Sequence, residues 1–115
     1  MKKDLSERVF NFAIRVILVL RNMPNDIEFR NIKHQLIRAV TSVGANYEEA
    51  QAASSRADFK NKVNIALKEI REAGYWIKII GALEHQHVSE ITELQAEAKE
   101  LTLILGSITA KVSRK

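Results

Sequence analysis

The sequence contains no cysteine, one proline and four glycines among its 115 residues. Without cysteine, the chain holds neither a disulfide framework nor a thiolate metal site, which fits a reducing cytoplasm. So few turn-forming residues argue against a sandwich or barrel of many short strands. The commonest residues are Ala, Leu, Ile, Glu, Lys and Arg, a mixture that favours helix. The composition therefore predicts an all-α domain.

Long apolar runs are also missing from the sequence. The run Val16–Leu20 is much shorter than the roughly 20 residues that a helix needs to cross a membrane. The N-terminus lacks the small-residue cleavage pattern of a secretory signal. We therefore expect a cytoplasmic protein with no membrane partner.

Apolar residues spaced three and four apart predict four amphipathic helices, over Asp4–Asn22, about Asp26–Ser54, Ser55–Ile80 and Ser89 to near the C-terminus. Their inner faces are predicted to carry Leu5, Val9, Phe12, Val16 and Leu20; Ile32, Leu36, Val40, Val43, Tyr47 and Ala50; Phe59, Val63, Ala66, Ile70, Ala73 and Ile77; and Ile91, Leu94, Ala98, Leu101, Leu105, Ile108 and Val112. Because the links are short, residues 1–115 should form one antiparallel, up-down-up-down four-helix bundle.

Several residues are predicted to cap these helices. Asp4 and Glu7 have capping-box spacing, and Ser55 suits the N-cap of the third helix. Gly81 suits a C-terminal cap, and Ser89 is expected to cap the fourth helix.

The first helix carries more apolar surface than one bundle needs. Phe10, Ile14 and Ile17 point away from its inner stripe, and Trp76 and Ile79 leave the inner face of the third helix. The alternative is that these helices are buried on most sides within one subunit. Every helix of a four-helix bundle keeps an outer face, so we favour self-association through these five residues.

No enzyme motif is present. The sequence lacks a Gly-rich phosphate loop, a G-x-S-x-G elbow and an H-E-x-x-H zinc motif. Glu84 and His87 match the Glu-x-x-His element of di-iron bundles, but such sites need two copies and two further glutamates. A solvated polar loop explains the pair better. We expect no catalytic residue, no metal site and no cofactor.

Charge is distributed unevenly along the chain. Residues 84–110 contain one basic residue, Lys99, and five acidic ones. Glu90, Glu93, Glu97 and Glu100 fall on one side of the fourth helix. They form either a solvated acidic face or a surface that meets a basic face of a neighbouring subunit.

Two rows of basic residues are the candidates for contact with nucleic acid. In the second helix, Arg30, His34 and Arg38 are spaced four apart and Lys33 lies beside them, and the candidates there are Arg30, Lys33 and Arg38. In the third helix the candidates are Arg56, Lys60, Arg71 and Lys78. Rows at helical spacing can follow the phosphates of RNA or DNA. In a monomer an ordinary solvated face is the better explanation, whereas a ring of subunits would repeat the rows and add their fields. No aromatic RNA-recognition motif is present, so binding should be directed to the backbone.

Several stretches of the sequence resemble one bacterial family over nearly the whole chain. They are Arg8-Val9-Phe10-x-Phe12-Ala13, Thr41-Ser42-Val43-Gly44-Ala45-Asn46-Tyr47, Ser55-Arg56-x-Asp58-Phe59 and Ile65-Ala66-Leu67-Lys68-Glu69-x-x-Glu72, with Tyr75-Trp76. The family is named for proteins encoded in the intervening sequences of 23S ribosomal RNA genes.

The resemblance implies a helical bundle that assembles as a homopentamer and has no established enzymatic activity. A related branch is the accessory variability protein of diversity-generating retroelements, which binds a reverse transcriptase and nucleic acid through a basic surface. Within the shared motifs, we expect Asn46 to fix helix register through hydrogen bonds. Glu69, Glu72 and Trp76 share one side of the third helix and could form a subunit contact.

Three functions therefore stay open. The first, which we favour, is a non-enzymatic, oligomeric accessory protein that binds RNA or DNA. The second is a protein-interaction scaffold, for example a subunit that accompanies a reverse transcriptase without binding nucleic acid itself. The third, ranked last, is a metal-dependent bundle enzyme.

Overall fold

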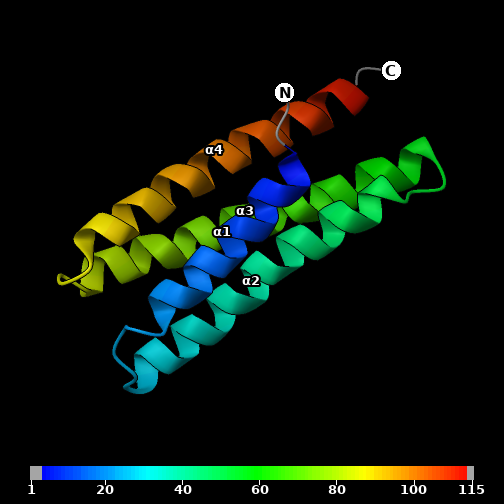
Figure 1. Ribbon diagram of the computed structural model, residues 1–115. Coiled ribbons are helices and arrows are strands. Elements are labelled where there is room, and N and C mark those ends of the chain that lie inside the picture. The colour runs from blue at the N-terminus through cyan, green and yellow to red at the C-terminus, as the bar shows by residue number, and fades with distance from the viewer. Residues whose placement is uncertain (1–3, 114–115) are drawn as a thin grey trace.

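The computed structural model describes residues 4–113, which form four α-helices and no strand (Figure 1). The helices are α1 (Leu5–Leu20), α2 (Ile27–Gln51), α3 (Arg56–Leu83) and α4 (Val88–Ser113). Consecutive helices run in opposite directions, which confirms the predicted up-down-up-down bundle. No described helix is both long enough and apolar enough to span a bilayer.

Each helix packs against two neighbours. The α2–α3 and α3–α4 contacts are the most extensive, and α1, the shortest helix, lies against α2 and α4. Within residues 4–113, no Cα atom of α1 lies within 8 Å of one in α3, and the same holds for α2 and α4. The bundle is therefore a ring of four contacts, in which the two diagonal pairs are separated by the core.

The core confirms the predicted inner faces. Phe12, Leu36, Ile70 and Leu101, one from each helix, are at most 1% exposed. The predicted inner residues that are only half-buried are Leu5, Tyr47, Phe59, Ile108 and Val112. All lie where α1 and α3 begin and α2 and α4 end, which an antiparallel arrangement places at one end of the bundle. The core is thus less completely covered at that end.

The helix ends agree only in part with prediction. The Ser55 hydroxyl accepts a hydrogen bond from the Asp58 N–H at 3.0 Å, as predicted for an N-cap. Asp4 occupies the N-cap of α1, but its side chain makes no capping hydrogen bond. The predicted Ser89 cap is also wrong, because α4 already begins at Val88.

The prediction for Gly81 is wrong for an informative reason. It has no positive φ, and α3 continues through it to Leu83. A Cβ added at Gly81 would lie 3.0 Å from Gln95 Nε2 and 3.4 Å from Ile91 Cγ2. The missing side chain therefore allows α3 and α4 to approach closely and does not terminate the helix.

Candidate nucleic-acid interface

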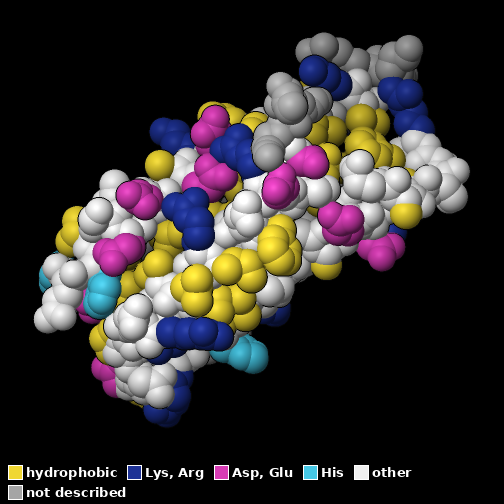
Figure 2. Space-filling view, viewed as in Figure 1, with side chains coloured by type: hydrophobic (Ala, Val, Ile, Leu, Met, Phe, Trp, Pro, Cys, Tyr) yellow, Lys and Arg dark blue, Asp and Glu magenta, His cyan; other side chains and the backbone are white. Residues whose placement is uncertain are grey.

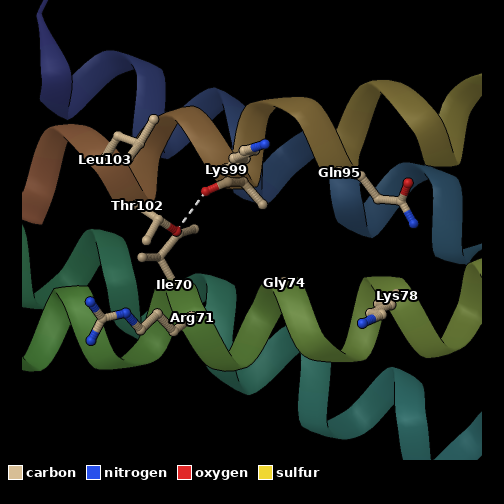
Figure 3. Close-up of a pocket in the computed structure, with 9 residues that line it drawn as sticks. Ile70, Arg71, Gly74, Lys78, Gln95, Lys99, Thr102 and Leu103 are labelled. Atoms are coloured by element: carbon tan, nitrogen blue, oxygen red, sulfur yellow. Dashed lines mark hydrogen bonds between the residues drawn. The ribbon is translucent and has the colours of Figure 1, made fainter.

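The outer junction of α3 and α4 contains a groove of about 670 Å³ (Figure 3). We call it the α3/α4 groove; its lining residues are Ile70, Arg71, Gly74, Lys78, Gln95, Ala98, Lys99, Thr102 and Leu103. Three of these residues are basic and none is acidic. Gly74 and Ala98 have no side chain beyond a methyl group, which leaves the middle of the groove open.

The three basic side chains of the groove are available to a ligand. Arg71, Lys78 and Lys99 are exposed, and within residues 4–113 none of them forms an ion pair or a side-chain hydrogen bond. In Figure 3, Arg71 and Lys78 come from α3 at the two ends of the groove, and Lys99 comes from α4 between them. Their fields therefore add over one concave surface.

Carboxylates are absent from the groove because the acidic side of α4 faces α1. The Arg8 guanidinium contacts Glu97 at 2.7 Å and Glu100 at 3.3 Å, and Arg15 lies 3.8 Å from Glu93. The pKa of the Arg8 guanidinium is raised, mainly because of its hydrogen bond to Glu97. Glu93 and Glu100 are exposed, as expected for a solvated acidic face, whereas Glu97 is largely covered by Arg8 of the same chain.

The three basic candidates of α2 form hydrogen bonds or ion pairs with groups of their own subunit. Arg30 donates to the Asn25 carbonyl at 3.1 Å, and Lys33 donates to the Met23 carbonyl at 3.1 Å. Both side chains thus hold the α1–α2 link. Arg38 binds Glu69 at 3.3 Å and also Glu72 on α3.

The Arg38 contacts form a small network between α2 and α3. The Trp76 indole N–H donates to Glu72 at 3.0 Å. The pKa of the Glu72 carboxyl is lowered mainly by this bond and, to a smaller extent, by the bond from Arg38. Glu69, Glu72 and Trp76 were expected at a subunit contact, and the structure gives the two glutamates a partner in their own subunit.

The remaining predicted cations lie on α3. Arg56 donates to the Val112 carbonyl at 3.2 Å, close to the C-terminal end of α4. Lys60 is half-buried.

Lys99 was missed as a candidate, because the sequence places it in an acidic segment. Its position opposite Arg71 and Lys78 is a property of the packing, and no local pattern indicates it.

The predicted apolar interface divides into two sets. Phe10, Ile14 and Ile17 line a shallow apolar groove of about 310 Å³ between α1 and α2, which we call the α1/α2 apolar face. Figure 2 shows apolar side chains gathered in this region. Phe10 is 63% exposed and Ile14 41%. Trp76 and Ile79, in contrast, are half-buried against the core on α3, the helix diagonally opposite α1.

Two polar predictions also change. Asn46 donates to the Ser42 carbonyl and hydroxyl, both at 3.0 Å and both in its own helix, so it does not link helices. Glu84 was expected in a solvated loop but is buried, 2.9 Å from His87 Nδ1, and accepts the Gln86 N–H. The described part of the chain contains no group of three or more side chains with metal-ligand chemistry.

Comparison with known proteins gives a consistent result. The model of the 23S rRNA-intervening sequence protein family matches residues 2–107. A crystal structure of a protein of unknown function from the S23 ribosomal protein family of Bacteroides thetaiotaomicron is 33% identical, with a TM-score of 0.83. The match covers 92% of this chain and 98% of that chain. No curated protein matches the sequence. The chain therefore belongs to the family of 23S rRNA-intervening sequence proteins.

Proposed function

We propose that this protein is a non-enzymatic, oligomeric accessory protein that binds the phosphate backbone of RNA or DNA through the α3/α4 groove. One observation carries the proposal. Arg71, Lys78 and Lys99 line one groove whose lining includes no carboxylate, and each lacks a partner among the described residues. When exposed cations without partners bind phosphates, counterions condensed on the nucleic acid are released, which gives affinity without sequence recognition.

The groove favours backbone contact over base recognition. It is lined by no aromatic side chain that could stack on a base. The hydroxyl of Thr102, one of its few polar groups, already donates to the Ala98 carbonyl at 2.7 Å. Selectivity among sequences should therefore be low, because base edges meet few hydrogen-bonding groups.

Self-association through the α1/α2 apolar face belongs to the same proposal. An exposed cluster that includes Phe10 and Ile14 is typical of an interface. The resemblance of the motifs implies a homopentamer, which would contain five copies of the α3/α4 groove. Several grooves that engage one strand would raise the apparent affinity well above that of one groove, provided that the strand reaches them.

A second candidate function rests on the same apolar face. The α1/α2 apolar face is a surface suited to a protein, and its partner could be a different chain, such as a reverse transcriptase. In that case the protein is a scaffold, and the α3/α4 groove has no role in binding nucleic acid.

Salt-dependent binding separates the two candidates. We would follow the fluorescence anisotropy of labelled RNA and DNA oligonucleotides at salt concentrations from 20 to 300 mM. Replacement of Arg71, Lys78 and Lys99 by Gln should abolish binding. The matched control replaces Arg21, Lys68 and Lys111, which are exposed and outside the groove, and therefore changes the net charge equally.

The control should keep most of the affinity. Equal losses in both triple variants would show that net charge, and not the groove, holds the nucleic acid. The absence of any binding at 20 mM salt, or binding that does not weaken as salt rises, would favour the scaffold.

A further inference from the structure

We infer that the α3/α4 groove accepts an unpaired nucleic-acid strand and excludes a double helix. The inference rests on the proposed function, since it names the form of nucleic acid that the groove takes. It follows from the width of the groove, the openness of its floor and the positions of its three cations.

The groove is narrow because its walls are two helices in direct contact. Packed helices lie about 8–10 Å apart, axis to axis. A double helix, whose major groove alone is about 12 Å wide, is too thick to enter such a space. It could touch only the rim, whereas the backbone of one strand is thin enough to lie between α3 and α4.

The floor of the groove has room for a sugar or a base. A Cβ added at Gly74 would meet no atom within 4 Å, so the space above this residue is empty. The volume of about 670 Å³ lies in the range of small-molecule sites and suits one or two nucleotides. Leu103, 66% exposed, offers an apolar surface beside this space.

The three cations match a short run of phosphates on one strand. Arg71 and Lys78 are seven residues apart on α3, which is about 10 Å along the helix. Lys99 projects from the opposite wall between them (Figure 3). A flexible single strand can turn its phosphates alternately toward the two walls. The phosphates of a duplex are fixed on a convex surface and cannot turn alternately toward the two walls.

The first test compares a single strand of six nucleotides with a duplex of six base pairs. A labelled hexamer of thymidine and a blunt six-base-pair hairpin, closed by a non-nucleotide linker so that it contains no unpaired nucleotide, would be titrated into the protein at several salt concentrations. The hexamer should bind about tenfold more tightly, although the hairpin carries more charge. Its logarithmic affinity should fall with a slope of about −2 against logarithmic salt, as expected for three phosphate contacts on a single strand.

The second test fills the groove without altering charge. Gly74→Leu should weaken hexamer binding by about tenfold, because the new side chain occupies the floor. Gly106→Leu is the matched control. Gly106 lies within α4, and a Cβ added there would also meet no atom within 4 Å, but Gly106 does not line the groove. Circular dichroism would verify that both variants fold, and Gly74→Ala provides a milder change.

The outcomes separate this inference from the proposed function. Binding of the hairpin as tight as that of the hexamer would overturn the inference, and so would equal effects of the two leucine variants. In either case, salt-dependent binding that Arg71, Lys78 and Lys99 control would leave the proposed function standing. Failure of both probes to bind at low salt would overturn both.

Discussion

The Arg8 guanidinium on α1 lies against the Glu97 carboxylate on α4, with Nη2 2.7 Å from Oε1 and Nε 3.1 Å from Oε2. This two-point contact joins residues 89 positions apart in the chain. The buried apolar stripe of α4, which includes Leu94, Leu101 and Leu105, fixes the rotation of this helix, with Glu97 toward α1 and Lys99 beside α3. The same rotation of α4 that pairs Glu97 with Arg8 leaves no carboxylate in the lining of the α3/α4 groove.

A double-mutant cycle should detect this contact. The side chains of Arg8 and Glu97 are only 30% and 19% exposed, so we expect Arg8→Gln and Glu97→Gln to couple by about 1–2 kcal/mol in urea unfolding. Arg15 and Glu93 provide the control, because they are 3.8 Å apart and more exposed. Their coupling should be below about 0.5 kcal/mol. Equal coupling in the two pairs would contradict the geometry.

The Glu72 network should make stability depend on pH. Its bonds with Trp76 and Arg38 lower the pKa of Glu72 below the ordinary value of 4.5. The carboxylate therefore stabilises the fold fully above about pH 4.5, and this contribution is lost as pH falls through the lower, folded pKa.

Glu72→Gln tests this dependence. The variant should have a lower Tm than the wild type at pH 7, and the difference in Tm should shrink toward pH 3. Thermal unfolding followed by circular dichroism measures it. Glu49→Gln, at an exposed position of α2, controls for the loss of one negative charge. A difference in Tm that stays constant from pH 7 to pH 3 would refute the prediction.

The α1/α2 apolar face should control assembly. Phe10→Glu combined with Ile14→Glu places charges on side chains that are already exposed, so the subunit should stay folded while the oligomer dissociates. Sedimentation velocity at micromolar concentration measures the change. Ile27→Glu is the control, because Ile27 is 72% exposed but does not line this face. A wild-type protein that sediments as a monomer would refute self-association.

Two glycines of α3 should respond differently to alanine. Gly74→Ala should stabilise the bundle by about 0.5–1 kcal/mol, because the methyl group enters open space and alanine favours helix. Gly81→Ala should gain less, since its methyl group would crowd Gln95 and the buried Ile91. Urea unfolding measures both changes. Equal gains would mean that α3 and α4 tolerate more bulk at Gly81 than the structure indicates.

Local patterns in the sequence were sufficient to predict the helices and most of the core. The apolar spacing in α1 alone identifies Val9, Phe12 and Val16 as buried, because a helix brings residues three and four apart onto one face. The Ser55 cap is equally local, since its hydrogen bond joins residues three apart. Gly81 shows the limit of this approach, because its role depends on the distance between two helices.

The candidate site was predicted only in part, for a related reason. Arg38 and Arg71 look alike as basic residues on amphipathic helices, but Arg38 faces two glutamates of α3 and Arg71 faces a groove. Lys99 looks unremarkable within an acidic segment, yet it completes the set of three cations. Local sequence does not encode which charges meet across helices.

The sequence by itself determined that this chain is a bundle of four amphipathic helices, because helical periodicity and capping depend on residues within one or two turns. The tertiary structure alone decided which charges are neutralised within the subunit and which remain for a ligand. Ion pairing falls steeply with distance, and the distances between side chains on different helices are set by packing. The available charge of the α3/α4 groove is therefore a consequence of how α1 and α4 pack together.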